Sequence, residues 1–125
     1  MSCFYIGESK MGRFVVQHSG NIDWEWKFRF ARQCSNFGVM LEEVASHSDE
    51  VYVDRYTGDD GEFVMLKADK NKLVEALSSI KLESCPICKT SECLEATLEM
   101  LKNFKEAVKE VDEPEIYGTW FVEYL

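Results

Sequence analysis

Apolar and polar residues alternate most regularly over residues 22–32, where every second position from Ile22 to Phe30 is a large apolar residue. A period of two places such side chains on one face of a β-strand. Residues 12–18 show a second alternating pattern, and Ser19, Gly20 and Asn21 between the two segments favour a tight turn. The pattern therefore predicts a hairpin of residues 12–18 and 22–32, whose apolar face forms part of the core. The apolar residues of the second segment are Ile22, Trp24, Trp26, Phe28 and Phe30.

Four further segments carry strand or turn signals. Residues 51–56 and 62–67 predict a second hairpin, because Gly58 and Gly61 lie in the short connection between them. A short strand is expected over residues 3–6. Residues 116–125 predict a final strand with apolar side chains on both faces, a pattern typical of a strand that is central or covered on both sides. One face carries Trp120, Val122 and Tyr124, and the other carries Tyr117 and Phe121.

Two segments show helical periodicity. Asp69 is placed to cap a helix over residues 70–81, and a longer helix is predicted over residues 91–111. A third segment, residues 35–48, holds a few apolar residues at helical spacing but is marginal as a helix on its own. The apolar seam of the long helix consists of Leu94, Leu98, Leu101, Phe104, Val108 and Val111.

This order of elements predicts an α+β fold: a mostly antiparallel sheet of five or six strands, with two helices packed on one face. The length of 125 residues favours a single domain, residues 1–125. The chain is 46% hydrophobic and 30% charged, which is typical of folded domains. No segment approaches the roughly 20 apolar residues of a membrane span, and the first residues do not resemble a signal peptide. We therefore expect a cytoplasmic protein that does not bind a membrane.

Charge is distributed unevenly along the chain. The formal net charge is −9, and residues 33–62 hold one basic residue against eight acidic ones. Residues 106–125 are a second acidic stretch. This balance argues against direct nucleic-acid binding and is suited to a partner protein with a basic surface, although charge runs also serve as plain solvated surface. The candidate partner-binding residues are Glu42, Glu43, Asp49, Glu50, Asp54, Asp59, Asp60 and Glu62.

Cysteines form the one local cluster with metal or redox potential. Cys85, Cys88 and Cys93 fall within nine residues between the two predicted helices. They could supply three thiolates to zinc, but a structural zinc site needs four ligands and no second C-x₂-C pair is present. Another hypothesis is a redox-active dithiol. Cys93 is expected in the first turn of a helix, and a helix N-terminus lowers the pKa of a thiol and so favours the thiolate. The alternative is that these are small packing residues or a stapling disulfide.

Catalytic motifs are absent from the sequence. His18 ends a predicted strand, where a hydrogen-bonding role is expected. His47 has serines on both sides, but sequence adjacency does not create a catalytic triad. We therefore expect no enzyme and no bound cofactor. The sequence favours a small acidic module that inhibits or adapts a basic, nucleic-acid-binding partner protein; the alternative is a zinc- or thiol-dependent protein that uses Cys85, Cys88 and Cys93.

Overall fold

The computed structural model describes residues 2–9, 12–24, 36–81 and 91–124. Within them, the other predicted strands and the two predicted helices are present and a third helix is added, but the predicted strand over residues 22–32 is not found in its described part, residues 22–24. The strands are β1 (Ser2–Ser9), β2 (Gly12–Gly20), β3 (Val51–Thr57), β4 (Gly61–Asp69) and β5 (Glu115–Tyr124). The helices are α1 (Asn36–Ala45), α2 (Lys70–Ser79) and α3 (Ser91–Lys109). No helix in this part of the chain is both long and apolar enough to span a membrane.

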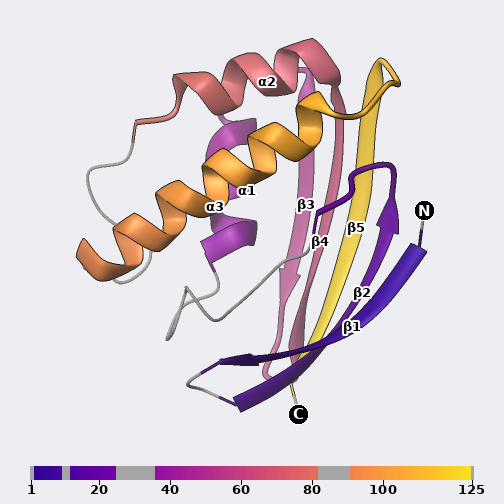
Figure 1. Cartoon of the computed structure of the whole chain (residues 1–125), viewed down its shortest axis with the longest axis vertical. Coiled ribbons are helices and arrows are strands. Elements are labelled where there is room, and N and C mark those ends of the chain that lie inside the picture. Colours follow the sequence, from indigo (N-terminus) through magenta and orange to yellow (C-terminus); the bar gives the residue numbers. More distant parts are fainter. Residues whose placement is uncertain (1, 10–11, 25–35, 82–90, 125) are drawn as a thin grey trace.

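All the strands pair antiparallel in one sheet, in the order β1-β2-β5-β4-β3. The helices lie on one side of this sheet (Figure 1). The α+β class and the antiparallel sheet are thus confirmed, but the prediction of two helices is wrong because α1 is a third. Its apolar residues Met40, Leu41 and Val44 are all buried. Burial against the sheet supplies the stability that a ten-residue helix lacks in isolation.

The predicted hairpin of residues 12–18 and 22–32 is wrong. Strand β2 pairs with β1 on one edge and with β5 on the other, so neither edge is free for residues 22–32. Gly20 lies within β2 with a φ of 144°, and a Cβ there would come within 2.3 Å of the Tyr117 carbonyl oxygen. This glycine therefore permits close backbone approach rather than a turn. Residues 22–24 are not in a strand, and residues 25–32 lie outside the described part of the chain.

The core lies between the sheet and the helices. Trp120 of β5 and Phe104 of α3 are fully buried, and their ring centroids are 6.3 Å apart. Trp24 meets both rings edge-on, at 5.2 Å from Phe104 and 6.3 Å from Trp120. Ile22 is also fully buried. Both Ile22 and Trp24 thus pack in or against the core as predicted, although they do so from an irregular segment.

His18 takes the hydrogen-bonding role that its place near the end of a strand predicts. Its ring is buried and stacks on Trp120 at a centroid distance of 4.7 Å. Nδ1 lies 3.1 Å from the Thr119 carbonyl oxygen, and Nε2 lies 2.8 Å from that of Ile22. The imidazole therefore connects β2 to β5 and to the segment that leaves β2.

Helix α3 buries a slightly different stripe from the predicted one. Leu101, Phe104 and Val108 are buried as expected, but Leu98 is 43% exposed and Thr97 is fully buried in its place. Positions 97, 101, 104 and 108 are spaced 4, 3 and 4 residues apart, which keeps them on one face of a helix with 3.6 residues per turn. Leu98 follows Thr97 by one residue and so points about 100° away from that stripe.

Helix α2 begins where the sequence predicts. The Asp69 carboxylate accepts a hydrogen bond of 3.0 Å from the Lys72 backbone N–H, which is the expected cap. Leu73 and Leu77 are buried. The helix lies beside α3 over the sheet (Figure 1), so α2 and α3 together cover the apolar side of the central strands.

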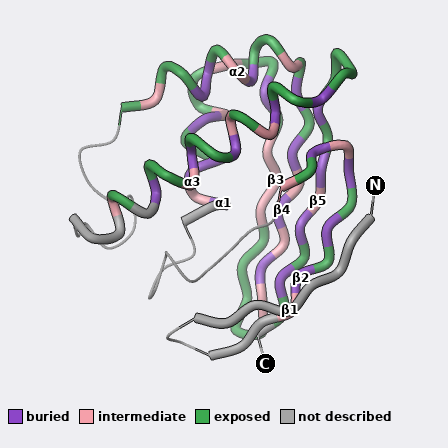
Figure 2. Tube along the Cα trace, in the orientation of Figure 1, coloured by how far each residue is buried: buried purple, intermediate pink, exposed green. Residues whose placement is uncertain are grey.

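The opposite face of the sheet is left open. Burial alternates along β4 and β5 (Figure 2). The buried apolar residues of both strands belong to the same core cluster as the buried apolar residues of the helices. Strand β5 is central, as its two apolar faces predict, but Tyr117 and Phe121 on its second face are 43% and 46% exposed. The described helices do not cover these side chains, so apolar character on both faces indicates a central strand here without indicating two covering layers.

Candidate protein-binding surface

Most of the predicted partner-binding acids gather along one edge of the sheet. This acidic edge follows β3, the edge strand, from α1 and the loop before the strand to the turn after it (Figure 1). Seven strand residues at roughly 3.3 Å each separate its two ends by about 20 Å. The edge therefore presents an elongated surface rather than a compact site. Its members are Glu42, Glu43, Asp49, Glu50, Asp54, Asp59 and Asp60.

Glu62 does not belong to this surface. Its side chain is only 1% exposed and accepts a hydrogen bond of 2.7 Å from Nε of Arg55. The Arg55 guanidinium also donates to Glu42 at 2.9 Å. Helix α1 passes over this ion pair at Gly38, where a Cβ would lie 2.5 Å from Glu62 Oε1 and 2.7 Å from Arg55 Nε. The sequence pattern predicts a surface position for Glu62. In the structure its buried carboxylate instead binds Arg55 beneath α1.

The ion pairs of Arg55 with Glu62 and Glu42 determine the charge balance of the acidic edge. Burial disfavours the charged form of Arg55, but the hydrogen bonds and charges of Glu62 and then Glu42 outweigh it and raise the pKa of Arg55. Two carboxylates thus share the one basic residue of the stretch. Among the described residues, no ion pair reaches the other carboxylates of the edge except the 3.7 Å contact between His47 and Glu43. Asp49, Glu50, Asp54, Asp59 and Asp60 therefore leave negative charge uncompensated.

The second acidic stretch meets the acidic edge at one end of the sheet. Glu115 at the start of β5 is in register with Asp69 at the end of β4. Ala68 is in register with Val51 at the start of β3, just after Glu50. Glu50, Asp69 and Glu115 therefore come to the same end of the sheet. The two acidic stretches are separate in sequence but adjacent in the fold.

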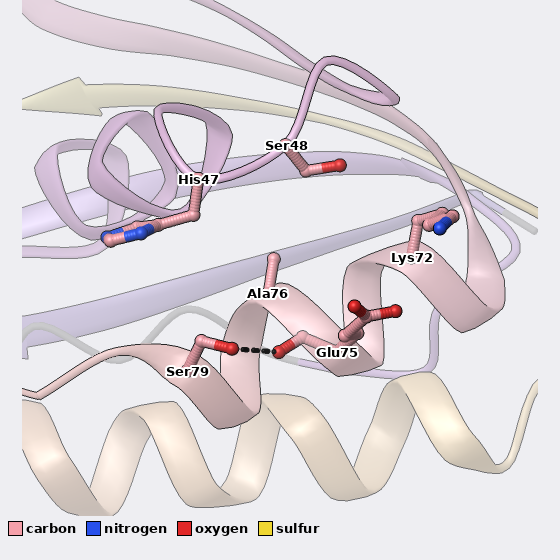
Figure 3. A pocket seen from close by; sticks show the side chains of 6 residues that line it. All are labelled: His47, Ser48, Lys72, Glu75, Ala76 and Ser79. Atoms are coloured by element: carbon pink, nitrogen blue, oxygen red, sulfur yellow. Dashed lines mark hydrogen bonds between the residues drawn. The ribbon is translucent and has the colours of Figure 1, made fainter.

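A polar hollow of about 270 Å³ lies between α2 and the loop that follows α1. His47 and Ser48 line it from the loop, and Lys72 and Glu75 line it from α2 (Figure 3). The His47 and Ser48 side chains point in opposite directions (Figure 3), and Ser48 Oγ instead accepts a hydrogen bond of 3.3 Å from the Glu50 backbone N–H. This arrangement does not supply the nucleophile–base hydrogen bond that acyl-transfer chemistry needs.

The cysteine cluster lies mostly outside the described residues. Cys85 and Cys88 fall in a segment without description, and Cys93 is in the first turn of α3, as predicted. Across residues 2–9, 12–24, 36–81 and 91–124, no group of three or more His, Cys, Asp or Glu side chains could hold a metal ion. The zinc and thiol hypotheses therefore remain predictions from sequence.

Exposed aromatic side chains on the open face are the functional candidates that the sequence analysis missed. Tyr52 and Tyr56 of β3 are 55% and 65% exposed, and they share this face with Tyr117 and Phe121 of β5. Monomeric proteins rarely expose many large apolar side chains together, and such patches often mark interaction surfaces. The signal was present in the alternation of β3 and β5, but the face that the helices leave open is decided by tertiary packing.

Comparison with known proteins finds no family model that matches the chain, and neither curated proteins nor solved structures give a match.

Proposed function

We propose that this protein is a small acidic interaction module that binds a partner protein with a basic surface through the acidic edge. The partner's basic surface would be one that otherwise contacts nucleic acid, so that binding inhibits or redirects it. The observation that carries the proposal is the run of carboxylates along β3, from Asp49 to Asp60, that have no ion-pair partner among the described residues. Complementary charge of this kind steers association and selects partners.

The geometry of the acidic edge supports an extended contact. Its carboxylates are distributed over about 20 Å, which is comparable to the dimensions of a standard interface burying about 800 Å² on each side. Asp59 and Asp60 project from the tight turn between β3 and β4, where both are exposed. They are therefore suited to charge reversal, because substitution there disturbs no packed side chain.

Affinity capture with matched baits tests the proposal. The wild-type chain, an Asp59→Lys/Asp60→Lys bait and a Glu95→Lys/Glu99→Lys bait are compared in lysate of the native host. Glu95 and Glu99 are exposed on α3, and their replacement by lysine changes the net charge as much as the replacement of Asp59 and Asp60 does. We expect a basic protein to be retained by the wild-type and control baits, released by salt, and lost from the turn variant. Capture that ignores both salt and the turn substitutions, or that yields no partner, contradicts the proposal.

A further inference from the structure

A row of three rings crosses the open face of the sheet. Tyr56 of β3, Phe63 of β4 and Phe121 of β5 are in register on neighbouring strands. The ring centroids of Tyr56 and Phe63 are 6.3 Å apart. Tyr56 is 65% exposed and Phe121 is 46% exposed, while Phe63 between them is half-buried. We call these three residues the aromatic row.

Two carboxylates stand beside the aromatic row on the same face. Asp54 lies two residues before Tyr56 on β3, and Glu123 lies two residues after Phe121 on β5. Two residues along a strand correspond to about 6.6 Å and return to the same face. Neither carboxylate has an ion-pair partner among the described residues. The row is thus flanked at both ends by negative charge that nothing described here neutralises.

We propose that the aromatic row binds arginine side chains from an extended segment of the basic partner. The proposal rests on the proposed function and adds a second, adjoining contact surface to it. A guanidinium group stacks on aromatic faces and is attracted by their electron-rich centres. Asp54 lies beside Tyr56 and Glu123 lies beside Phe121, on opposite sides of the row. Each carboxylate would therefore attract a guanidinium that stacks on the ring nearest to it.

Charge complementarity favours an arginine-bearing segment over a second copy of the chain as the partner that covers the open face. Among residues whose side chains the structure describes, Lys67 is the only basic one on the open face, and its Nζ lies 3.9 Å from Glu115. Face-to-face pairing of two copies would bring together two faces that both carry the carboxylates of Asp54 and Glu123, which is unfavourable because neither has an ion-pair partner in the described part of the chain. A polypeptide that carries arginine removes this repulsion and covers the rings.

The spacing along the strands fits alternate residues of an extended peptide. Tyr52 and Tyr117 flank Lys67 in a second row, four strand residues from the aromatic row. Four residues span about 13 Å, which equals the distance between side chains i and i+4 of an extended chain. In the second row the register already places a basic residue, Lys67, between Tyr52 and Tyr117, and its Nζ cation lies 3.9 Å from Glu115. The aromatic row has no such cation among the described side chains and is therefore the place where an external arginine binds.

Fluorescence anisotropy with two labelled peptides tests the inference. One ten-residue peptide alternates arginine with serine, and its counterpart alternates lysine with serine. We expect the wild-type chain to bind the arginine peptide more tightly. The variant Tyr56→Leu/Phe121→Leu keeps apolar side chains but removes two rings, and should weaken arginine-peptide binding about 5- to 30-fold. Leu98→Ala, an equally exposed apolar site on α3, should leave it unchanged.

The outcomes separate this inference from the proposed function. Unchanged arginine-peptide affinity in the leucine variant overturns the inference, as does absence of preference for arginine over lysine. If Asp59→Lys/Asp60→Lys still abolishes partner capture in that case, the proposed function stands without the aromatic row. A wild-type dimer that becomes monomeric in Phe121→Leu, measured by sedimentation, assigns the face to a second copy and also overturns the inference.

Discussion

Gly38 is where α1 comes closest to the buried pair of Arg55 and Glu62. An added Cβ would lie 2.5–2.8 Å from atoms of those two side chains, so they would have to move. We expect Gly38→Ala to lower the free energy of unfolding by about 1–3 kcal/mol, although alanine normally favours a helix. Gly58→Ala is the control, because no atom lies within 4 Å of a Cβ there. Urea unfolding measures both, and equal stability of Gly38→Ala and wild type contradicts this packing.

Glu62 and Glu42 both bind Arg55 but differ in burial. The Glu62 side chain is 1% exposed, whereas that of Glu42 is 51% exposed. Glu62→Gln leaves a half-buried guanidinium short of negative charge, and should cost about 1–3 kcal/mol of stability. Glu42→Gln should cost less than about 1 kcal/mol, since exposed ion pairs contribute little. Thermal or urea unfolding of the two variants that shows equal losses would refute the distinction.

The buried position of Glu62 and the shared binding of Arg55 by Glu62 and Glu42 could not be predicted from single residues. Hydrophobic alternation marks Glu62 as polar, and in the strand pattern polar means solvent-facing. Its actual face carries Val64 and Leu66, so parity with them places Glu62 inward once the strand is known to begin at Gly61. What the sequence could not supply is the partner, because Arg55 reaches Glu62 only through the pairing of β3 with β4.

At the scale of elements, the buried stripe of α3 gives a direct comparison. Phe104 is fully buried against Trp24 and Trp120, whereas Leu98 is 43% exposed on the same helix. We expect Phe104→Ala to cost about 3–5 kcal/mol and Leu98→Ala to stay within about 0.5 kcal/mol. Denaturant unfolding of the two variants checks the ranking. A large loss for Leu98→Ala would mean that α3 buries the stripe that its leucines suggest.

Local signals predicted some elements well and long-range pairing poorly. The hairpin of β3 and β4 and the Asp69 cap of α2 depend on neighbouring residues, and both were predicted. The assignment of Ser19, Gly20 and Asn21 to a turn failed because their partners are about a hundred residues away. Asn21 donates to the Glu115 carbonyl oxygen and accepts from the Tyr117 N–H, so it continues the pairing of β2 with β5.

At the scale of the whole molecule, the excess negative charge lies along α1 and β3, from the turn after β3 to the end of the sheet where β5 begins. Like charges this close repel and destabilise the folded state at low ionic strength. We expect the melting temperature to rise between about 0.01 M and about 0.15 M salt. Asp59→Asn/Asp60→Asn should raise it by about 2–5 °C at the lower salt concentration. Melting temperatures that do not change with salt would contradict strong repulsion along the acidic edge.

The composition predicted the sign of this surface, and the fold determines its shape. Counting charges by stretch identified residues 33–62 and 106–125, but only the register of β3, β4 and β5 brings Glu50 and Glu115 to one end of the sheet. The aromatic row is likewise a product of register, since its three residues lie on three strands. Its presence beside the acidic edge gives the molecule two adjoining surfaces that are suited to the same cationic partner.

The association rate of a captured partner tests the role of the acidic edge most directly. Exposed charges of a binding surface act mainly on association, so Asp59→Lys/Asp60→Lys should lower the association rate constant about tenfold at about 0.05 M salt, with little change in dissociation. The difference from wild type should shrink as salt is raised toward about 1 M, where charges are screened beyond about 3 Å. An association rate constant that is the same for both chains and independent of salt would contradict the account.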